Sequence, residues 1–435
     1  MRILVITRHN PLPGTDGAAT YLGQVTAALA ARGHVVGCAW TERAPQWNSR
    51  LRVVADLPAG VRDFFAPDIR FSRGRAWQFR QWWQAQVRTF KAWRLRLLGR
   101  SLPPAAPWSH AGRPWDDACN ADEQAMIASA IEQFQPDVLF ANFSWMTTAA
   151  PFWIAAGRPL AVLAHDARHC QLTLDADDRL VEEIDAATRA TEAEHLATAQ
   201  LIAAIQPREA TLLRSLVPTA EVVVLPPGRP PSASLQQPPS NRPIVLFVGS
   251  GHTANREGAR WLITAVWPLV RALRPDARLQ LAGPVTNELS PAEGVEFLGR
   301  VPDLAPTYAA ASLVVAPIRR GSGVKIKVIE ALQHHRVVVA TPVAADGLEF
   351  LRDALPVAAT AGDFAEAIVA LLGAPDRAAA LVKKAEARMR VALAPETALA
   401  PFLTALELLP ERKRTFDVND RGFGANPPAR LSLTR

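Results

Sequence analysis

Short apolar runs alternate with helical segments along most of this 435-residue chain, and this alternation restricts the fold more than any other feature. Runs such as 3–7 and 137–141 are almost wholly apolar, as is typical of strands that are buried on both faces of a parallel sheet. The segments between them, beginning with 18–32, have helical spacing. The pattern predicts an α/β fold built from doubly wound sheets.

A stretch rich in Pro, Ser and Gln divides this alternation into two parts. Residues 229–242 lack an apolar period, which indicates a linker, and the pattern begins afresh with the apolar run 244–248. We therefore predict two Rossmann-like domains, at 1–228 and 243–390. Because such sheets bind ligands at the carboxyl ends of their strands, a ligand is expected in a cleft between the two domains. Beyond 411 the chain is basic and aperiodic, so 411–435 is predicted to be a disordered tail.

Composition narrows the classes of function without choosing among them. The net charge of +7 favours anionic partners such as phosphates, nucleic acid or acidic membranes. The three cysteines lie far apart, which excludes a disulfide framework and a cysteine zinc site and fits a reducing cytoplasm. No run approaches the ~20 uncharged apolar residues that cross a bilayer, so any membrane contact is expected to be peripheral.

The strongest motif follows the apolar run 313–316. A loop flanked by glycines leads into a helix at about 325–334, where unpaired amides and the helix dipole would face an anion such as a diphosphate. Lys327 would add positive charge where a departing diphosphate develops negative charge, and Glu330 could accept hydrogen bonds from a ribose diol. The residues expected to bind the donor here are Gly321, Ser322, Gly323, Val324, Lys325 and Glu330, with Arg319 and Arg320 just before them.

A plainer interpretation of this motif stays open. A glycine-rich loop before a helix is often only a turn with a cap, and Glu330 could be a solvated residue paired with Lys327 or His334 at helical spacing.

Further stretches form a set with this loop. In the second half they are Phe-Val-Gly-Ser at 247–250, Trp-Pro at 267–268, Gly-Val-Glu-Phe-Leu-Gly at 294–299 and Ala-Thr-Pro at 340–342. The first half contributes Gly-His-Val at 33–35 and His-Asp at 165–166. With these motifs the sequence resembles glycosyltransferase family 4, a group of retaining transferases with the GT-B fold. The resemblance covers 243–350 well and 1–230 weakly.

The resemblance implies functions for individual residues. It implies sugar transfer from a nucleotide diphosphate donor with retention at the anomeric carbon and without a metal or other cofactor. His165 matches a histidine that faces the donor sugar, and Gly17 a glycine that lets backbone amides approach donor phosphate or acceptor. A helix near 391–410 is expected to return to the N-terminal domain. The expected catalytic residues are His165, Lys327 and Glu330, and the further donor-binding residues are Gly17, Gly249, Asn255 and Arg256. The alternatives are a structural histidine satisfied by Asp166 or backbone, and a plain loop glycine.

The sequence also departs from the family pattern. The family commonly carries two glutamates eight positions apart, whereas Ser322 stands at the first of these positions and Glu330 at the second. Many members have an Arg and a Lys after the first strand of the donor domain, where this chain reads Gly-Ser-Gly at 249–251. A branch with such a loop and a downstream lysine is similar, so Lys327 and Arg256 are candidate replacements.

Two other segments suggest partners. The segment 73–100 has aromatic residues on one side at helical spacing and arginines on the other, which predicts a basic amphipathic helix. Such a helix suits an anionic membrane surface or a lipid diphosphate acceptor, or it packs on its own domain with snorkelling arginines. No nucleic-acid motif accompanies it, so nucleic acid is not an expected partner. Residues 175–178 contain an Asp-x-Asp pattern, but no strand is expected before it and it lies beside a predicted helix rich in Glu182, Glu183 and Asp185, which favours a solvated acidic face over a metal site.

These observations predict a retaining glycosyltransferase of the hexosyltransferase type. Its donor would be a nucleotide sugar and its acceptor a polysaccharide or a lipid-linked saccharide, in the cytoplasm or at the inner face of the cell membrane. Two alternatives on the same fold are a nucleotide-sugar epimerase and a non-catalytic scaffold that binds nucleotide sugar.

Overall fold

The structure is a computed structural model, and it describes residues 1–12, 17–42, 52–54, 58–66, 69–71, 118–228, 243–301 and 303–411. The predicted basic helix at 73–100, the linker at 229–242 and the tail beyond 411 lie outside the described residues.

The first sheet contains seven parallel strands in the order β11-β10-β7-β6-β1-β2-β4. Its strands are β1 (Arg2–Thr7), β2 (Val35–Trp40), β4 (Val61–Phe65), β6 (Val138–Asn142), β7 (Leu160–Ala164), β10 (Leu201–Ala204) and β11 (Glu221–Val224). Strands β1, β6, β7 and β10 are almost completely buried, which explains why they appear in the sequence as unbroken apolar runs. We call this sheet and its helices the N-terminal domain.

Helices cover both faces of this sheet. Ile3 and Val5 of β1 belong to an apolar cluster that includes side chains of α1 (Gly17–Ala31) and α15 (Ala400–Glu407). Leu4 and Ile6 point to the opposite face and belong to a second cluster. That cluster includes side chains of α3 (Ala121–Phe134), α4 (Pro151–Ala155), α5 (Ala186–Leu196) and α6 (Pro207–Leu216). This arrangement confirms the predicted doubly wound architecture.

The second sheet contains five parallel strands in the order β14-β13-β12-β15-β17. They are β12 (Ile244–Val248), β13 (Arg278–Ala282), β14 (Val295–Gly299), β15 (Leu313–Ala316) and β17 (Val338–Ala340). The larger helices of this C-terminal domain are α7 (Thr253–Trp261), α8 (Trp267–Leu273), α10 (Ile326–Gln333), α12 (Ala361–Leu372) and α13 (Pro375–Ala392). A π-helical turn, Leu262–Val266, joins α7 to α8. It lies just before Pro268, which has no amide hydrogen for the regular helical ladder.

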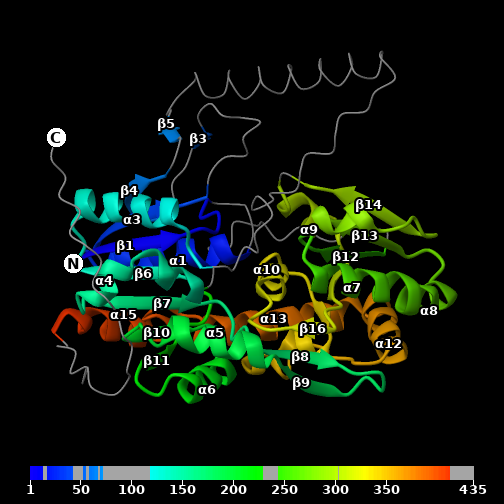
Figure 1. Cartoon of the computed structure of the whole chain (residues 1–435). Helices are drawn as coiled ribbons and strands as arrows, with labels where there is room; N and C mark the ends of the chain where they lie inside the picture. Colours follow the sequence, from blue (N-terminus) through cyan, green and yellow to red (C-terminus); the bar gives the residue numbers. More distant parts are fainter. Residues whose placement is uncertain are drawn as a thin grey trace, which may run out of the picture.

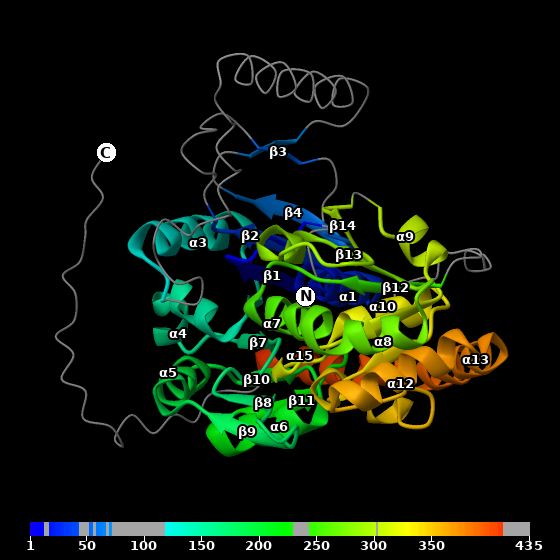
Figure 2. The ribbon, with the colours of Figure 1, turned by 90° about the vertical axis from the view of Figure 1, so that its right-hand side faces the viewer.

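The end of the described chain returns to the N-terminal domain. After α13, helix α15 lies beside β10 and β11 in both views of the ribbon (Figures 1 and 2). The ring centroid of Phe402 on α15 lies 5.4 Å from that of Phe140 on β6. Nε2 of His34 lies 3.1 Å from Oε1 of Glu407.

A small third sheet joins the two domains. The hairpin of β8 (Cys170–Leu174) and β9 (Leu180–Ile184) leaves the N-terminal domain and reaches beneath β16 (Arg320–Gly321) of the C-terminal domain (Figure 1). Strand β16 pairs antiparallel with β8, with Arg320 opposite Thr173. The acidic residues Glu182 and Glu183 therefore lie on a strand and not on a helix, because α5 begins only at Ala186.

A candidate active site at the domain junction

His165 directly follows β7 and is fixed on two sides. Its ring stacks on Phe143 with 4.0 Å between centroids and meets Tyr21 edge-on at 5.4 Å. Its Nε2 lies 2.7 Å from Oδ1 of Asn142. The Asn142 amide donates through Nδ2 to Thr7 Oγ1 at 3.0 Å, which leaves Oδ1 as an acceptor for the imidazole N–H. The ring thus has a defined orientation and a preferred tautomer.

The backbone of Phe143 has a strained conformation. Its φ of 78° and ψ of 153° lie in a region that is normally open only to glycine, and such a conformation costs of order 1–3 kcal/mol. The strained turn places the Phe143 ring between His165 and Trp145, whose centroid is 4.4 Å away. Backbone strain of this kind is concentrated at functional sites. The sequence gives no sign of Phe143 or Asn142 beyond their place at the end of β6.

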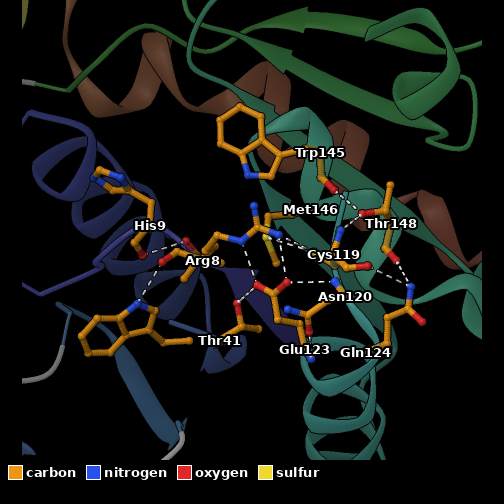
Figure 3. A network of polar contacts seen from close by, with 12 residues as sticks. Arg8, His9, Thr41, Cys119, Asn120, Glu123, Gln124, Trp145, Met146 and Thr148 are labelled. Carbon is orange, nitrogen blue, oxygen red and sulfur yellow. Dashed lines mark hydrogen bonds and ion pairs between the residues drawn. The ribbon is translucent and has the colours of Figure 1, made fainter. Parts of the chain in front are cut away.

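A buried ion pair supports the same edge of the sheet (Figure 3). Arg8, at the end of β1, donates to both carboxylate oxygens of Glu123, at 2.7 and 2.9 Å. Glu123 also accepts hydrogen bonds from Thr41 and from the amide of Asn120, which caps α3. Burial raises the pKa of Glu123, but these hydrogen bonds outweigh it and the pKa lies below its ordinary value. The Arg8–Glu123 ion pair therefore holds α3 against the sheet.

The glycine-rich loop of the C-terminal domain lies directly against His165. Gly323 has φ of 71°, and a Cβ placed there would lie 2.8 Å from the backbone oxygen of His165, so only glycine fits. Ser322 donates through Oγ to Oδ2 of Asp166 at 2.8 Å. A Cβ on Gly17 would lie 3.3 Å from Cδ1 of Ile326, so α1 begins beside the start of α10. Gly17, His165 and the loop therefore meet at one junction.

Several loop groups that were expected to bind phosphate have protein partners here. The amide of Gly323 donates to Oε1 of Glu209, on α6, at 2.6 Å. Lys325 donates through Nζ to the backbone oxygens of Ser322 and Gly323, at 2.9 and 2.6 Å. The loop is thus closed on itself and held by the side-chain carboxyl group of Glu209 in the N-terminal domain. Diphosphate binding by Gly321, Gly323, Val324 and Lys325 stays a prediction.

Buried charges surround this contact. Burial, together with the nearby charge of Asp166, raises the pKa of Glu209 to about 8. Burial also raises the pKa of Asp166 and lowers that of Lys325. Burial therefore disfavours the charged form of each group, and the attraction of Lys325 for the two N-terminal-domain carboxyls depends on the two domains being in contact.

A second cationic group, Lys327, lies on the first turn of α10. Lys327 donates through Nζ to Oδ1 of Asn255, which in turn donates to Ser250 Oγ at 2.9 Å. The Nζ atom lies 4.9 Å from the ring centroid of Phe247. Burial and the nearby charge of Lys325 lower the pKa of Lys327 to about 7. The structure thus brings Lys327 together with Asn255 and the Gly249–Ser250 loop.

Arg256 and Glu330, the remaining predicted donor-binding residues, have different surroundings. Arg256 is one residue beyond Asn255, and its Nη2 lies 3.4 Å from Thr253 Oγ1 on the same helix. Glu330 is partly buried and is not a fully solvated residue. Burial raises its pKa, while Tyr308 and Lys327 oppose this effect. Tyr308 is completely buried and stacks on His334 at 4.5 Å.

The acidic turn between β8 and β9 makes contacts with arginines. Asp178 lies 2.8 Å from Nη1 of Arg319, and Asp175 and Asp177 both contact Arg179. Within the described ranges, no group of three or more His, Cys, Asp or Glu residues is arranged to hold a metal ion.

None of the helices in the described ranges combines the length and the apolar character needed to cross a bilayer.

Comparison with known proteins defines the class of fold. Residues 242–374 match the family model described as glycosyl transferases group 1. The matched range includes α10 and its preceding loop. A curated relative, the uncharacterized 44.6 kDa protein in the cps region of Klebsiella pneumoniae, is 28% identical over 116 residues. That match covers 24% of this chain, and the chain spans only 30% of the relative's length.

Solved structures share the fold over nearly the whole chain. Sucrose-phosphate synthase from Thermosynechococcus elongatus is 18% identical, with a TM-score of 0.62, and covers 94% of this chain and 100% of its own. S. aureus TarM is 10% identical with a TM-score of 0.62, covering 93% and 99%. HepE from Anabaena, in complex with UDP and glucose, is 15% identical with a TM-score of 0.56, covering 94% and 100%. The fold is GT-B, as predicted, and with the matched domain it supports a glycosyltransferase.

Proposed function

We propose that this protein transfers a sugar from a nucleotide diphosphate donor to a saccharide acceptor with retention at the anomeric carbon. The observation that carries the proposal is the meeting of His165 with the Ser322–Gly323 loop across the domain junction. In a GT-B enzyme the reacting groups belong at such a junction, where donor and acceptor domains meet and water is excluded.

The donor is a nucleotide sugar whose diphosphate lies beside Lys327. This lysine stands near the start of α10, where helix amides and the helix dipole favour an anion. An arriving diphosphate would favour the charged form of Lys327 and would replace Asn255 as its partner. The HepE structure contains UDP and glucose, and a trehalose-6-phosphate protein of E. coli with the same fold was solved with UDP-2-fluoro glucose.

The residues at the junction divide the chemistry between them. His165, oriented by Asn142 and Phe143, would position the donor sugar. Lys327 and the α10 amides would stabilise the negative charge that develops on the departing diphosphate. Glu330 would accept hydrogen bonds from the ribose. No metal ion or other cofactor is required by this assignment, since the cationic side chain and the helix terminus supply the positive charge.

The acceptor is a growing polysaccharide or a lipid-linked saccharide. The partial similarity to a protein of a cps region favours this class. The basic segment 73–100 would bring the enzyme to an anionic membrane surface at the inner face of the cell membrane, which remains an expectation because it lies outside the described residues.

A panel of nucleoside diphosphates and nucleotide sugars tests the proposal. A selective nucleotide should raise the melting temperature by mass action. Lys327→Met should weaken nucleotide binding at least about tenfold, whereas His165→Ala should retain binding and lose transfer or donor hydrolysis. Conversion of the donor sugar to an epimer without any acceptor would indicate an epimerase, and binding without turnover would indicate a scaffold. Unaltered nucleotide affinity in Lys327→Met would contradict the site.

A further inference from the structure

A polar recess of about 420 Å³ lies where the β8–β9 hairpin, the start of α5 and β16 meet. Its lining consists of Arg168, His169, Gln171, Glu183, Ile184, Asp185, Thr188 and Arg320. We infer that this recess binds a neutral sugar unit of the acceptor. The inference rests on the proposed function, and it adds a place and a chemical class for the acceptor.

Buried contacts behind the recess fix its wall. Glu192 of α5 is completely buried, and its carboxylate accepts hydrogen bonds from the amides of Arg168 and His169, at 3.2 and 3.1 Å. The same carboxylate lies 2.7 Å from Nδ1 of His169. The amide of Asp185 donates to the backbone oxygen of His169 at 2.9 Å. The wall is therefore held in shape by groups that a ligand does not need to displace, as a binding site requires.

Strand register builds the floor of the recess. Gln171 lies opposite Glu183 on β9, and Thr173, two residues further along β8, lies opposite Arg320 on β16. Opposed residues share one face of a sheet, and so do residues two apart on a strand. Gln171, Glu183 and Arg320 therefore point to the same side. The 3.4 Å contact between Nη2 of Arg320 and Oε2 of Glu183, across β8, agrees with this arrangement.

The side chains suit a neutral polyhydroxyl ligand. Arg168 and Arg320 supply two positive charges, and Glu183 and Asp185 supply two negative ones, so the charges of these four groups cancel. Guanidinium, carboxylate and amide groups present paired donors or acceptors that match neighbouring hydroxyls. Because these charges cancel, the recess offers a phosphate no net attraction, and Ile184 alone offers too little apolar surface for a lipid chain.

The recess also lies close to the reaction centre along the chain. Arg168 is two residues beyond Asp166, and Arg320 is two residues before Ser322, which hydrogen-bonds to Asp166. Two residues span at most about 7 Å, so these backbone positions lie close to the junction, and the inference requires a saccharide held in the recess to extend toward His165. Since Arg320 belongs to the C-terminal domain and Gln171 to the N-terminal domain, the recess is complete only while β16 pairs with β8.

Saccharide binding by the full chain tests the inference. The chain, saturated with UDP, is applied to an array of neutral and uronic-acid-containing oligosaccharides, and the affinity of the strongest neutral ligand is then measured by calorimetry. Gln171→Ala and Thr188→Val should each weaken that affinity about tenfold or more and leave UDP affinity unchanged, and Gln171→Ala, which leaves the Asp185 cap of α5 intact, should also leave the melting temperature unchanged. Gln280→Ala, on β13 of the other domain, serves as the matched control and should leave both the saccharide affinity and the UDP affinity unchanged.

The outcomes separate the two proposals. Saccharide affinity that is indifferent to Gln171→Ala and Thr188→Val, a preference for uronic acids, or no saccharide binding by a chain that binds UDP would overturn the recess and leave the donor site standing. Recess-dependent saccharide binding by a chain that binds no nucleotide would sustain the recess as a sugar site and contradict the proposed transferase.

Discussion

The pKa of Lys327 makes nucleotide binding depend on pH in a way that can be calculated. Burial and the neighbouring Lys325 hold this pKa at about 7, so the side chain is largely neutral at pH 8 and above. A nucleoside diphosphate binds the charged form better, because it brings negative charge to the ammonium group. The affinity for UDP should therefore fall as the pH rises above 7.

The size of the effect follows from the charged fraction. A group with a pKa of about 7 is roughly half protonated at pH 7, about one tenth at pH 8 and about one hundredth at pH 9. The dissociation constant should therefore rise about fivefold from pH 7 to 8 and about tenfold from pH 8 to 9, as long as the bound lysine keeps its proton. A tenfold change corresponds to about 1.4 kcal/mol. Titration of the ligand adds little to this pH dependence, because its phosphate has a pKa of about 6 and is already deprotonated above pH 7.

Calorimetry at pH 7, 8 and 9, in buffers with different enthalpies of ionisation, measures the dissociation constant and the number of protons taken up on binding. Wild-type protein should take up close to one proton per UDP at pH 8. Lys327→Arg is the matched control, since its guanidinium stays charged throughout this range and its affinity should be nearly independent of pH. The same pH dependence of affinity in Lys327→Arg as in wild type, or binding without proton uptake, would show that Lys327 does not gain a proton when the nucleotide binds.

Three further changes test the junction. Phe143→Gly should be about 1 kcal/mol more stable than Phe143→Ala in urea unfolding, because φ of 78° strains alanine and not glycine; equal stabilities, or a more stable alanine variant, would contradict the strain. Gly323→Ala should lower the melting temperature and abolish transfer, since its Cβ meets His165, whereas Gly23→Ala, with nothing within 4 Å, should do neither. Burial raises the pKa of Glu209 to about 8, so in wild type its contribution to stability is present below pH 4.5 and lost as the pH rises toward 8 and beyond. The excess melting temperature of Glu209→Gln over wild type should accordingly grow from pH 5 to 8, and a constant difference would argue against a buried, proton-binding carboxyl.

The fold could be predicted because its determinants are local. Each buried parallel strand is an apolar run, and the loop at 317–324 lies between such a run and a helix, so its place at the edge of the sheet follows from the sequence. Lys327 was predicted from the loop and helix motif and Asn255 from the resemblance to a family, and the structure brings them into contact.

The missed features depend on residues that are distant in the sequence. Asn142 and Phe143 acquire importance only because β6 lies beside β7, which carries His165. The Glu209–Gly323 hydrogen bond joins residues 114 positions apart in two domains. The interpretation of Glu182 and Glu183 as part of a helix was wrong because strand pairing with β8 decides the conformation of that segment, and short segments have weak local preferences.

A crystal structure of the full chain with UDP would show whether the donor diphosphate binds beside Lys327. We expect the diphosphate to lie at the start of α10, with a phosphate oxygen within hydrogen-bonding distance of Lys327 Nζ and on the side of the loop that faces His165. UDP bound elsewhere, or bound while Lys327 keeps Asn255 as its partner and makes no phosphate contact, would contradict it.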